Sequence, residues 1–385
     1  MRISVIVKIL GLLLLIFGAL ANFPPLIVSW IYEDGMASEF ITSFIYVSGA
    51  GFFMWLSSFR TTKELGTKEG FLIVTLFWVV LGTAGSLPFL LSPAVELSLT
   101  DAVFESLSGL TTTGATVISG LDDLPKSLLF YRQQLQWLGG MGIIVLAMAL
   151  LPMLGIGGMQ LYRAESPGPV KDNKLVPRLA ETAKALWYIY LTLTIVCALA
   201  YWIVGMNLFD AISHSFTTVA IGGFSTHDQS MGYFDNSAVE IVAIIFMFIA
   251  GINFALHFTA WQKRNISHYV KDPEFKFYAL ILTTVSVVTV VVLYFSEIYT
   301  SASDALIKGV FQVVSFATTT GFATADFNSW PLFLPYMLLY AAIIGACAGS
   351  TGGGMKVIRI LLIFKQGFRE VQRLIHPKAV IPIKL

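Results

Sequence analysis

Three short segments of the 385-residue chain carry the residue types needed to bind a cation through backbone oxygens. They read TTTG at 111–114, AIGG at 220–223 and TTTG at 318–321, and their final glycines are separated by 109 and 98 residues. Glycine adopts backbone angles that a side chain excludes, so consecutive carbonyls can face one point, where their oxygens replace the water shell of an ion. The glycines are Gly114, Gly223 and Gly321, and the carbonyls expected to contact the ion belong to Thr112, Thr113, Ile221, Gly222, Thr319 and Thr320.

The repetition favours a binding site more than any one segment does, because a single Thr-Gly segment is ordinarily a surface turn. Each segment follows a short stretch that reads DAVFESLSGL, DAISHSFTTV or KGVFQVVSFA, and each lies between two long apolar runs. About ten residues of helix cover about 15 Å, which is half the thickness of the bilayer core. The stretches are therefore predicted to be half-helices that enter the membrane from outside, and the segments after them to be re-entrant loops.

The ends of these half-helices indicate which charge they favour. Asp101 and Asp210 are the expected N-caps of the first two, because a carboxylate satisfies free backbone amides; the third has Lys308 at the aligned position and Asp304 one turn earlier. The C-terminal end of each helix carries about half a negative charge. If the three ends converge, they form a site for a cation.

The composition identifies the environment of these elements. Hydrophobic residues make up 56% of the chain, charged residues 12%, and the mean hydropathy is +0.77, whereas soluble domains contain about 25% charged residues. The chain is therefore predicted to be an integral membrane protein. Cys197 and Cys347 both lie in apolar runs, so no disulfide framework is expected. Eight runs are long enough to cross a membrane, at 5–31, 40–59, 71–91, 130–152, 185–206, 238–261, 277–296 and 331–364.

The first run has an alternative interpretation. Arg2 and Lys8 precede or begin a Leu-rich core, and the sequence Ala19-Leu20-Ala21 has the small-residue pattern of a signal-peptide cleavage site. The apolar character continues through Trp30, however, which favours a membrane span.

The distribution of charge predicts the orientation. With the amino terminus in the cytoplasm, 21 of the 24 Lys and Arg residues fall in inner segments, and only Lys126, Arg132 and Lys308 fall in outer ones. This is the pattern of the positive-inside rule. The same arrangement places 15 of the 23 acidic residues outside, either as a solvated rim or as a vestibule that attracts cations.

Several longer stretches resemble the Trk/Ktr/HKT superfamily of potassium transporters, in particular the membrane subunit, of H-subunit type, of the bacterial Trk potassium-uptake system. They read SGLTTTGAT at 108–116, RQQLQWLGGMGIIVLA at 132–147, GGMQLYRAESPGP at 157–169, AIGGFSTHD at 220–228 and GACAGSTGGGMKVIRI at 345–360. The resemblance covers essentially the whole chain.

The resemblance implies an all-α integral membrane fold in which tandem span, re-entrant loop and span repeats surround a pseudo-fourfold pore, with an extra amino-terminal helical hairpin. It implies a homodimer in the bacterial inner membrane, surrounded by lipid and gated by a cytoplasmic regulatory subunit that binds a nucleotide, NAD or ATP. K+ is then the transported ion, whether the transport is channel-like or a symport with protons or sodium. No organic cofactor, catalytic residue or nucleic-acid partner is expected. Glycine at all three loop positions resembles the potassium-selective pattern.

The repeat spacing divides the chain into five parts. They are a hairpin at 1–62, a first repeat at 63–160, an inner linker and second repeat at 161–262, a third repeat at 263–370 and a cytoplasmic linker at 371–385. A fourth loop glycine is expected about 100 residues after Gly321. The sequence ends at Leu385, so we expect a chain truncated before its fourth repeat.

The last apolar run is interrupted by small and polar residues, which predicts a loop beneath the re-entrant segments that lines the pore. The resemblance implies that this loop gates the pore. The residues of this gating loop are Gly345, Gly349, Ser350, Thr351, Gly352, Gly353, Gly354 and Lys356. A GxxxG packing face formed by Gly345 and Gly349 is the alternative. Gly139, Gly140 and Gly142 are expected to allow a neighbouring helix to approach closely. The segment 162–184 is either a docking surface for the cytoplasmic partner or a plain connection.

Two other functions remain to be weighed. Ser225 and His257 are a conceivable nucleophile and base of an intramembrane hydrolase, although the chain contains no GxSxG or HExxH motif. A pore-like subunit that does not conduct, or that only regulates others, is the second alternative, favoured by the missing fourth repeat. Ion flux with and without a restored carboxy-terminal repeat separates this alternative from a transporter.

Overall fold

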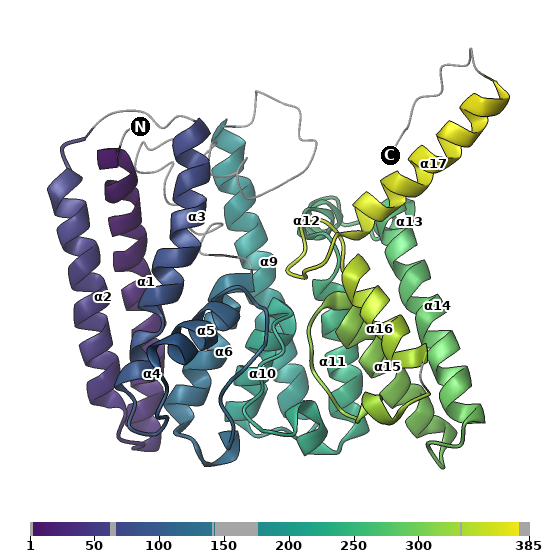
Figure 1. The fold of residues 1–385 in the computed structure, drawn as a ribbon, viewed down its shortest axis with the longest axis horizontal. Coiled ribbons are helices and arrows are strands. Elements are labelled where there is room, and N and C mark those ends of the chain that lie inside the picture. The colour runs from purple at the N-terminus through teal and green to yellow at the C-terminus, as the bar shows by residue number, and fades with distance from the viewer. Residues whose placement is uncertain (1–2, 62–66, 141, 143–175, 332, 377–385) are drawn as a thin grey trace. The chain divides into compact units, whose positions relative to one another are not determined.

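The computed structural model describes residues 3–61, 67–140, 142, 176–331 and 333–376, and every regular element within these ranges is a helix (Figure 1). The predicted all-α class is confirmed. The chain divides into two compact units, Met1–Tyr233 and Phe234–Leu385. The boundaries of the individual repeats stay predictions, and the segment 162–184 lies largely outside the described residues.

The first unit contains eight α-helices within the described ranges. They are α1 (Ile3–Tyr32), α2 (Ala37–Ser58), α3 (Thr67–Ala84), α4 (Leu87–Leu91), α5 (Leu99–Leu110), α6 (Lys126–Gly140), α9 (Val176–Ile203) and α10 (Leu208–Ala220). The helices α1 and α2 pack side by side as the predicted hairpin, and α1 also contacts α3 and α6 (Figure 1). The helix α1 continues without a break well past Ala21.

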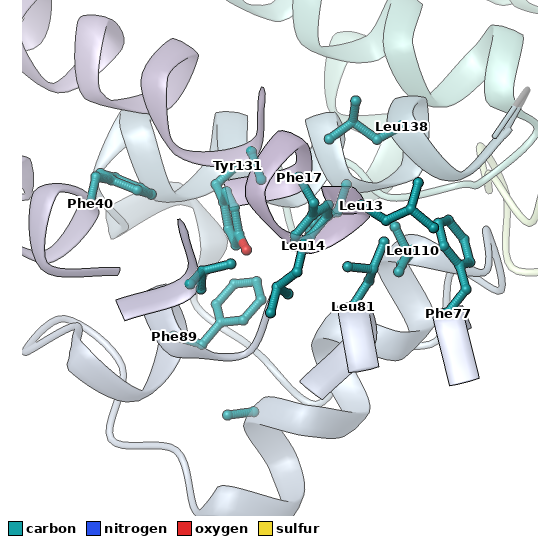
Figure 2. Close-up of a cluster of buried hydrophobic side chains, with 14 of the residues drawn as sticks. Leu13, Leu14, Phe17, Phe40, Phe77, Leu81, Phe89, Leu110, Tyr131 and Leu138 are labelled. Atoms are coloured by element: carbon teal, nitrogen blue, oxygen red, sulfur yellow. The ribbon is translucent and has the colours of Figure 1, made fainter. Parts of the chain in front are cut away.

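The core of the first unit forms where these helices meet. Figure 2 shows Leu13, Leu14 and Phe17 of α1 beside Phe77, Leu81, Leu110 and Leu138 from three other helices. At its edge, the ring of Tyr131 lies 5.3 Å from that of Phe89 and 5.7 Å from that of Phe40. The Tyr131 hydroxyl donates a hydrogen bond of 2.7 Å to the Gly85 carbonyl, so a polar group inside this apolar core is satisfied. The core fixes α5 and α6 relative to the amino-terminal hairpin.

The second unit is built around the long helix α14 (Pro273–Phe295) and α15 (Ala302–Thr318), which pack against each other. Its other helices are α11 (Ser237–Ala250), α12 (Phe254–Gln262), α13 (Ser267–Lys271), α16 (Phe333–Ile344) and α17 (Val357–Ile375). Both α11 and α16 also contact α15, so this helix packs against three others of the second unit (Figure 1).

The predicted spans agree with the helices in part. Five helices within the described residues are long and apolar enough to cross a membrane, and α11 with α12 makes a sixth if the bent pair counts as one span. The expected straight span at 238–261 is wrong in shape, because the chain bends by 88° between these two helices. The last expected span, 331–364, is broken between α16 and α17. The latter half of the fourth, from residue 141, lies outside the described residues apart from Gly142.

Candidate functional site

Three half-helices occur where they are expected. They are α5 with 12 residues, α10 with 13 and α15 with 17. The last begins one turn earlier than the repeat alignment indicates, since a helical turn has about 3.6 residues. We call the segments that follow them loop 1 (111–117), loop 2 (221–226) and loop 3 (319–324).

The predicted N-caps are wrong by three residues. Ser98 and Asn207 are the caps, and their side chains accept hydrogen bonds from the backbone amides of Asp101 (3.2 Å) and Asp210 (2.9 Å). The side chains of Ser98 and Asn207 in turn donate hydrogen bonds of 2.7 and 2.6 Å to the carboxylates of Asp101 and Asp210, respectively. Asp is favoured both at the cap and within the first turn, so the sequence does not separate these positions. In α15 the cap is Ser301.

All three half-helices end in the same way. The amides of Thr113, Gly222 and Thr320 each bond to the carbonyl five residues earlier, at 2.9, 2.9 and 2.8 Å. This is the bond of a Schellman turn, which normally places a glycine in the left-handed conformation. The loops therefore share one backbone geometry at their start, as the repeat predicts.

Each loop contains two residues in the left-handed conformation, a glycine and a β-branched residue. The glycines have φ of +77° (Gly114), +82° (Gly223) and +86° (Gly321), as their predicted role requires. Two residues before each, Thr112, Ile221 and Thr319 also have positive φ, of 55°, 55° and 66°. A β-branched residue with positive φ is an outlier, and such strain costs of order 1–3 kcal/mol for each residue. Nothing in the amino-acid sequence indicates this feature.

The expected carbonyl ligands differ in their surroundings. Within the described part of the chain, no donor bonds to the carbonyl oxygens of Thr112, Thr113, Ile221, Thr319 and Thr320. The Gly222 carbonyl is different, since it accepts a hydrogen bond of 2.7 Å from the Gln136 side chain. A carbonyl oxygen has two lone pairs, so this bond leaves room for a second partner.

One position on each half-helix supports the loop that follows it. This position lies nine residues before the loop glycine and holds Glu105, His214 and Gln312. Glu105 accepts hydrogen bonds from the Thr116 hydroxyl (2.9 Å) and the Val117 amide (3.1 Å). His214 lies 3.0 Å from the Ser225 hydroxyl, and Gln312 lies 3.4 Å from the Thr324 amide. The three equivalent side chains thus differ in charge, but each one supports the loop of its own repeat. The alignment of the repeats places them at one position, although we did not predict their role from it.

The helix α6 contributes two further supports that sequence reasoning missed. Gln136 donates to the Gly222 carbonyl and accepts a hydrogen bond of 3.0 Å from the Phe224 amide, so one side chain clamps loop 2 at two points. One turn earlier, Arg132 is fully buried. The sequence had placed Arg132 among the outer charges, together with Glu105, Asp210 and Glu240. These four residues are buried within their units and do not belong to a solvated rim.

Lys308 is the second exception to the positive-inside pattern that the structure explains. Its ammonium group is 2.5 Å from the Glu240 carboxylate, and this ion pair joins α15 to α11. Among the described residues, the pair makes no hydrogen bond to any of the three loops.

An ionic cluster joins the outer segments that follow loops 1 and 2. The His227 ring bonds to Asp122 through Nδ1 and lies 3.2 Å from Asp210 through Nε2. Burial lowers the His227 pKa, but the bonds to the two carboxylates outweigh it, and the pKa is raised above its ordinary value. Beside it, Asp228 accepts hydrogen bonds from the Gly120 and Leu121 amides at 3.0 and 2.9 Å.

The predicted break in the last span is a folded loop between Gly345 and Lys356, which we call the 345–356 loop. Gly345 and Gly349 have φ of +75° and +68°, so the alternative of a helical GxxxG face does not apply. The Gly353 amide donates a hydrogen bond of 2.6 Å to the Thr319 hydroxyl. The Lys356 ammonium group caps the loop from within by bonding to the Gly352 carbonyl.

Each residue of the predicted hydrolase pair is hydrogen-bonded within its own unit. Both ring nitrogens of His257 are engaged, Nδ1 with the Tyr269 hydroxyl at 2.7 Å and Nε2 with the Ile249 carbonyl at 3.0 Å. The Ser225 hydroxyl lies against His214 instead, and it also accepts a hydrogen bond from the His227 amide. Ser225 is therefore the residue of loop 2 that His214 supports.

The chain is similar to a family model and to several known proteins. The family model TrkH, described as a cation transport protein, matches residues 36–385. The Trk system potassium uptake protein TrkH of Halomonas elongata is 57% identical over 385 residues, which are 100% of this chain and 80% of that protein. TrkG of Escherichia coli K12 is 39% identical over 384 residues and is covered to 79%.

A solved structure has the same fold. The crystal structure of the potassium transporter TrkH from Vibrio parahaemolyticus matches with a TM-score of 0.89 and 53% sequence identity, covering 100% of this chain and 79% of that chain. Since the family model matches most of the chain and a relative is more than half identical along all of it, this chain belongs to the TrkH family of cation transport proteins.

Proposed function

We propose that this chain carries K+ into the cell across the bacterial inner membrane, through a pathway lined by backbone carbonyls of loops 1, 2 and 3. The family and the named relatives, which are potassium uptake proteins, support potassium as the ion. The amino terminus lies in the cytoplasm, in keeping with the distribution of Lys and Arg.

The observation that carries the proposal is the strained backbone shared by the three loops. Each loop holds a β-branched residue and a glycine, two positions apart, with positive φ. A protein keeps such strain where the arrangement serves a function, and a left-handed residue turns the carbonyls next to it away from the helical direction. Carbonyls without a protein donor are then free to replace the water shell of a dehydrated cation. The ligands are the carbonyl oxygens of Thr112, Thr113, Ile221, Gly222, Thr319 and Thr320.

The 345–356 loop is the gate in this proposal. It contacts Thr319, whose carbonyl is a ligand, so a movement of the loop changes the end of the pathway nearest to it. A cytoplasmic regulatory subunit that binds NAD or ATP moves the loop, and two copies of the chain form the working dimer. The relatives bear names of a Trk system, which supports a multi-component assembly.

The selectivity part of the proposal is tested by Gly321→Ser in the native gene product, reconstituted in liposomes. A side chain at φ +86° is strained even though nothing lies within 4 Å of the added Cβ. We expect discrimination of K+ against Na+ to fall by about tenfold, which corresponds to about 1.4 kcal/mol. Gly35→Ser is the matched control, because Gly35 also has positive φ (+79°) and open space but lies in the turn between α1 and α2.

Unaltered selectivity of Gly321→Ser, or equal loss in both variants, would count against the filter assignment. A native gene product that is folded but carries no K+ would instead support the alternative of a regulatory, non-conducting subunit.

A further inference from the structure

The side chain of Arg132 contacts both loops of the first unit. Its Nε lies 2.8 Å from the Glu105 carboxylate, and its Nη2 donates a hydrogen bond of 3.0 Å to the Thr116 hydroxyl in loop 1. Its Nη1 donates a hydrogen bond of 3.2 Å to the Ser225 carbonyl in loop 2, and the guanidinium carbon lies 4.4 Å from the centre of the Phe224 ring. One buried side chain therefore joins two loops that are about 110 residues apart in the sequence.

The two contact points are equivalent in the repeat. Thr116 and Ser225 each stand two residues after a loop glycine, Gly114 or Gly223. Glu105 strengthens the link on the side of loop 1, since it also accepts a hydrogen bond of 3.1 Å from the Val117 amide. The distance between corresponding points of loops 1 and 2 is thus set by the length of a single guanidinium group.

A buried ion pair is a costly way to join two segments, because both charges lose their hydration and an apolar pair of similar volume is often as stable. The guanidinium group differs from an apolar contact because its hydrogen bonds have fixed directions. Its donors lie in one plane and point in fixed directions, whereas the ammonium group of lysine is a point charge on a flexible chain. Three acceptors in three directions require this planar group.

We propose that Arg132 is a positioning residue for ion selectivity. It fixes the separation of loops 1 and 2 and, with it, the size and field of the carbonyl cage to which Thr112, Thr113, Ile221 and Gly222 contribute. This inference rests on the proposed function, because cage size and the number of carbonyl dipoles matter only if the carbonyls bind the ion.

The experiment compares K+ and Na+ flux through the native gene product and four variants in liposomes. Arg132→Lys keeps the charge but loses the planar group, and the double variant Arg132→Gln with Glu105→Gln avoids leaving a buried charge unpaired. Thr116→Val removes the hydroxyl that Arg132 and Glu105 share, whereas Thr116→Ser keeps it.

We expect Arg132→Lys, the double variant and Thr116→Val to lower the K+ to Na+ flux ratio, by about tenfold for Arg132→Lys, while Thr116→Ser stays close to the wild type. The loss should appear mainly as faster Na+ flux, with K+ flux retained. A merely structural role would lower both fluxes together and leave their ratio unchanged.

The matched control is the ion pair of Lys308 with Glu240, which makes no hydrogen bond to any of the three loops among the described residues. Replacing both residues by Gln is expected to change thermal stability and to leave the flux ratio unchanged. A wild-type ratio in Arg132→Lys, or in the double variant if the first does not fold, overturns the inference alone. A wild-type protein without K+ to Na+ discrimination overturns the proposed function and this inference with it.

Discussion

The Gly353 amide donates a hydrogen bond of 2.6 Å to the Thr319 hydroxyl, so the loop that interrupts the last helix rests on the strained residue at the start of loop 3. Thr319 accepts this bond through its side chain, which leaves its carbonyl without a donor within the described residues. Thr319 thus contacts the proposed gate through its hydroxyl oxygen, while its carbonyl oxygen is a proposed ligand of the ion.

The contact predicts the effect of two changes on gating. Thr319→Val keeps the shape of the side chain and removes the acceptor, so the 345–356 loop is held less firmly and K+ flux without the regulatory subunit should rise. Deleting Gly352 to Gly354 should raise it further. Thr319→Ser retains the hydroxyl and is the control in a liposome flux assay. If flux is unchanged in both the valine variant and the deletion, the loop is not the gate.

The hydrogen bonds of Gln136 predict that two glutamines of α6 contribute differently to stability. Gln136→Leu leaves the Gly222 carbonyl and the Phe224 amide without their partner, and a buried group left unpaired costs about 1–3 kcal/mol. Gln133 is also fully buried, but neither amide atom of its side chain has a partner among the described residues. Gln133→Leu should therefore be neutral or stabilising. Thermal unfolding in detergent measures both, and a destabilisation of equal size in the two variants would contradict this account of loop 2.

The ionic cluster around His227 predicts a pH dependence of the outer segments. The rings of Tyr233 and His214 lie parallel to the His227 ring at 3.4 and 6.4 Å, and the carboxylates of Asp122 and Asp210 bond to its nitrogens. The raised pKa means that the folded protein holds the proton more tightly than the unfolded chain. The stabilisation is complete below about pH 6.5, the ordinary value, and is lost as the pH rises through the raised pKa of the folded state.

Amide hydrogen exchange measures this effect at Gly120 and Leu121, whose amides bond to Asp228 beside the cluster. After correction for the intrinsic pH dependence of exchange, protection should fall as the pH rises above about 6.5 and through the raised pKa of His227. His227→Gln should abolish that change. Protection that is independent of pH in the wild type would show that the proton on His227 does not hold the segments together.

Close helix packing predicts opposite effects of two alanine substitutions. A Cβ on Gly139 would lie 1.8 Å from the Leu110 carbonyl oxygen at the end of α5, where only a shift of the backbone makes room. Gly139→Ala should cost about 1–3 kcal/mol or more. Gly49 in α2 has nothing within 4 Å of the corresponding position, so Gly49→Ala should stabilise by about 0.5–1 kcal/mol. Similar melting temperatures for the two variants would contradict this packing of α5 against α6.

The sequence predicts the elements of the site better than it predicts their supports. The loop glycines and the half-helices are visible because they repeat with a local pattern. The roles of Arg132 and Gln136 could not be predicted, because these side chains bond to residues about 90 positions away in the sequence. In addition, the sequence assigns a charge near the end of an apolar run to an outer segment whether its side chain faces water or the protein. The bend after α11 could not be predicted either, since hydropathy measures how apolar a run is and not the direction of its helices.

That bend ties the second repeat to the proposed gate. The Cys347 amide bonds to the Gly251 carbonyl at 3.0 Å, and the Phe254 amide bonds to the Gly349 carbonyl at 2.9 Å, so both sides of the bend hold the 345–356 loop. Release of the loop would break these two hydrogen bonds, which lie on either side of the bend. In the proposed gating movement, the free energy of opening therefore includes a contribution from the residues of the bend between α11 and α12.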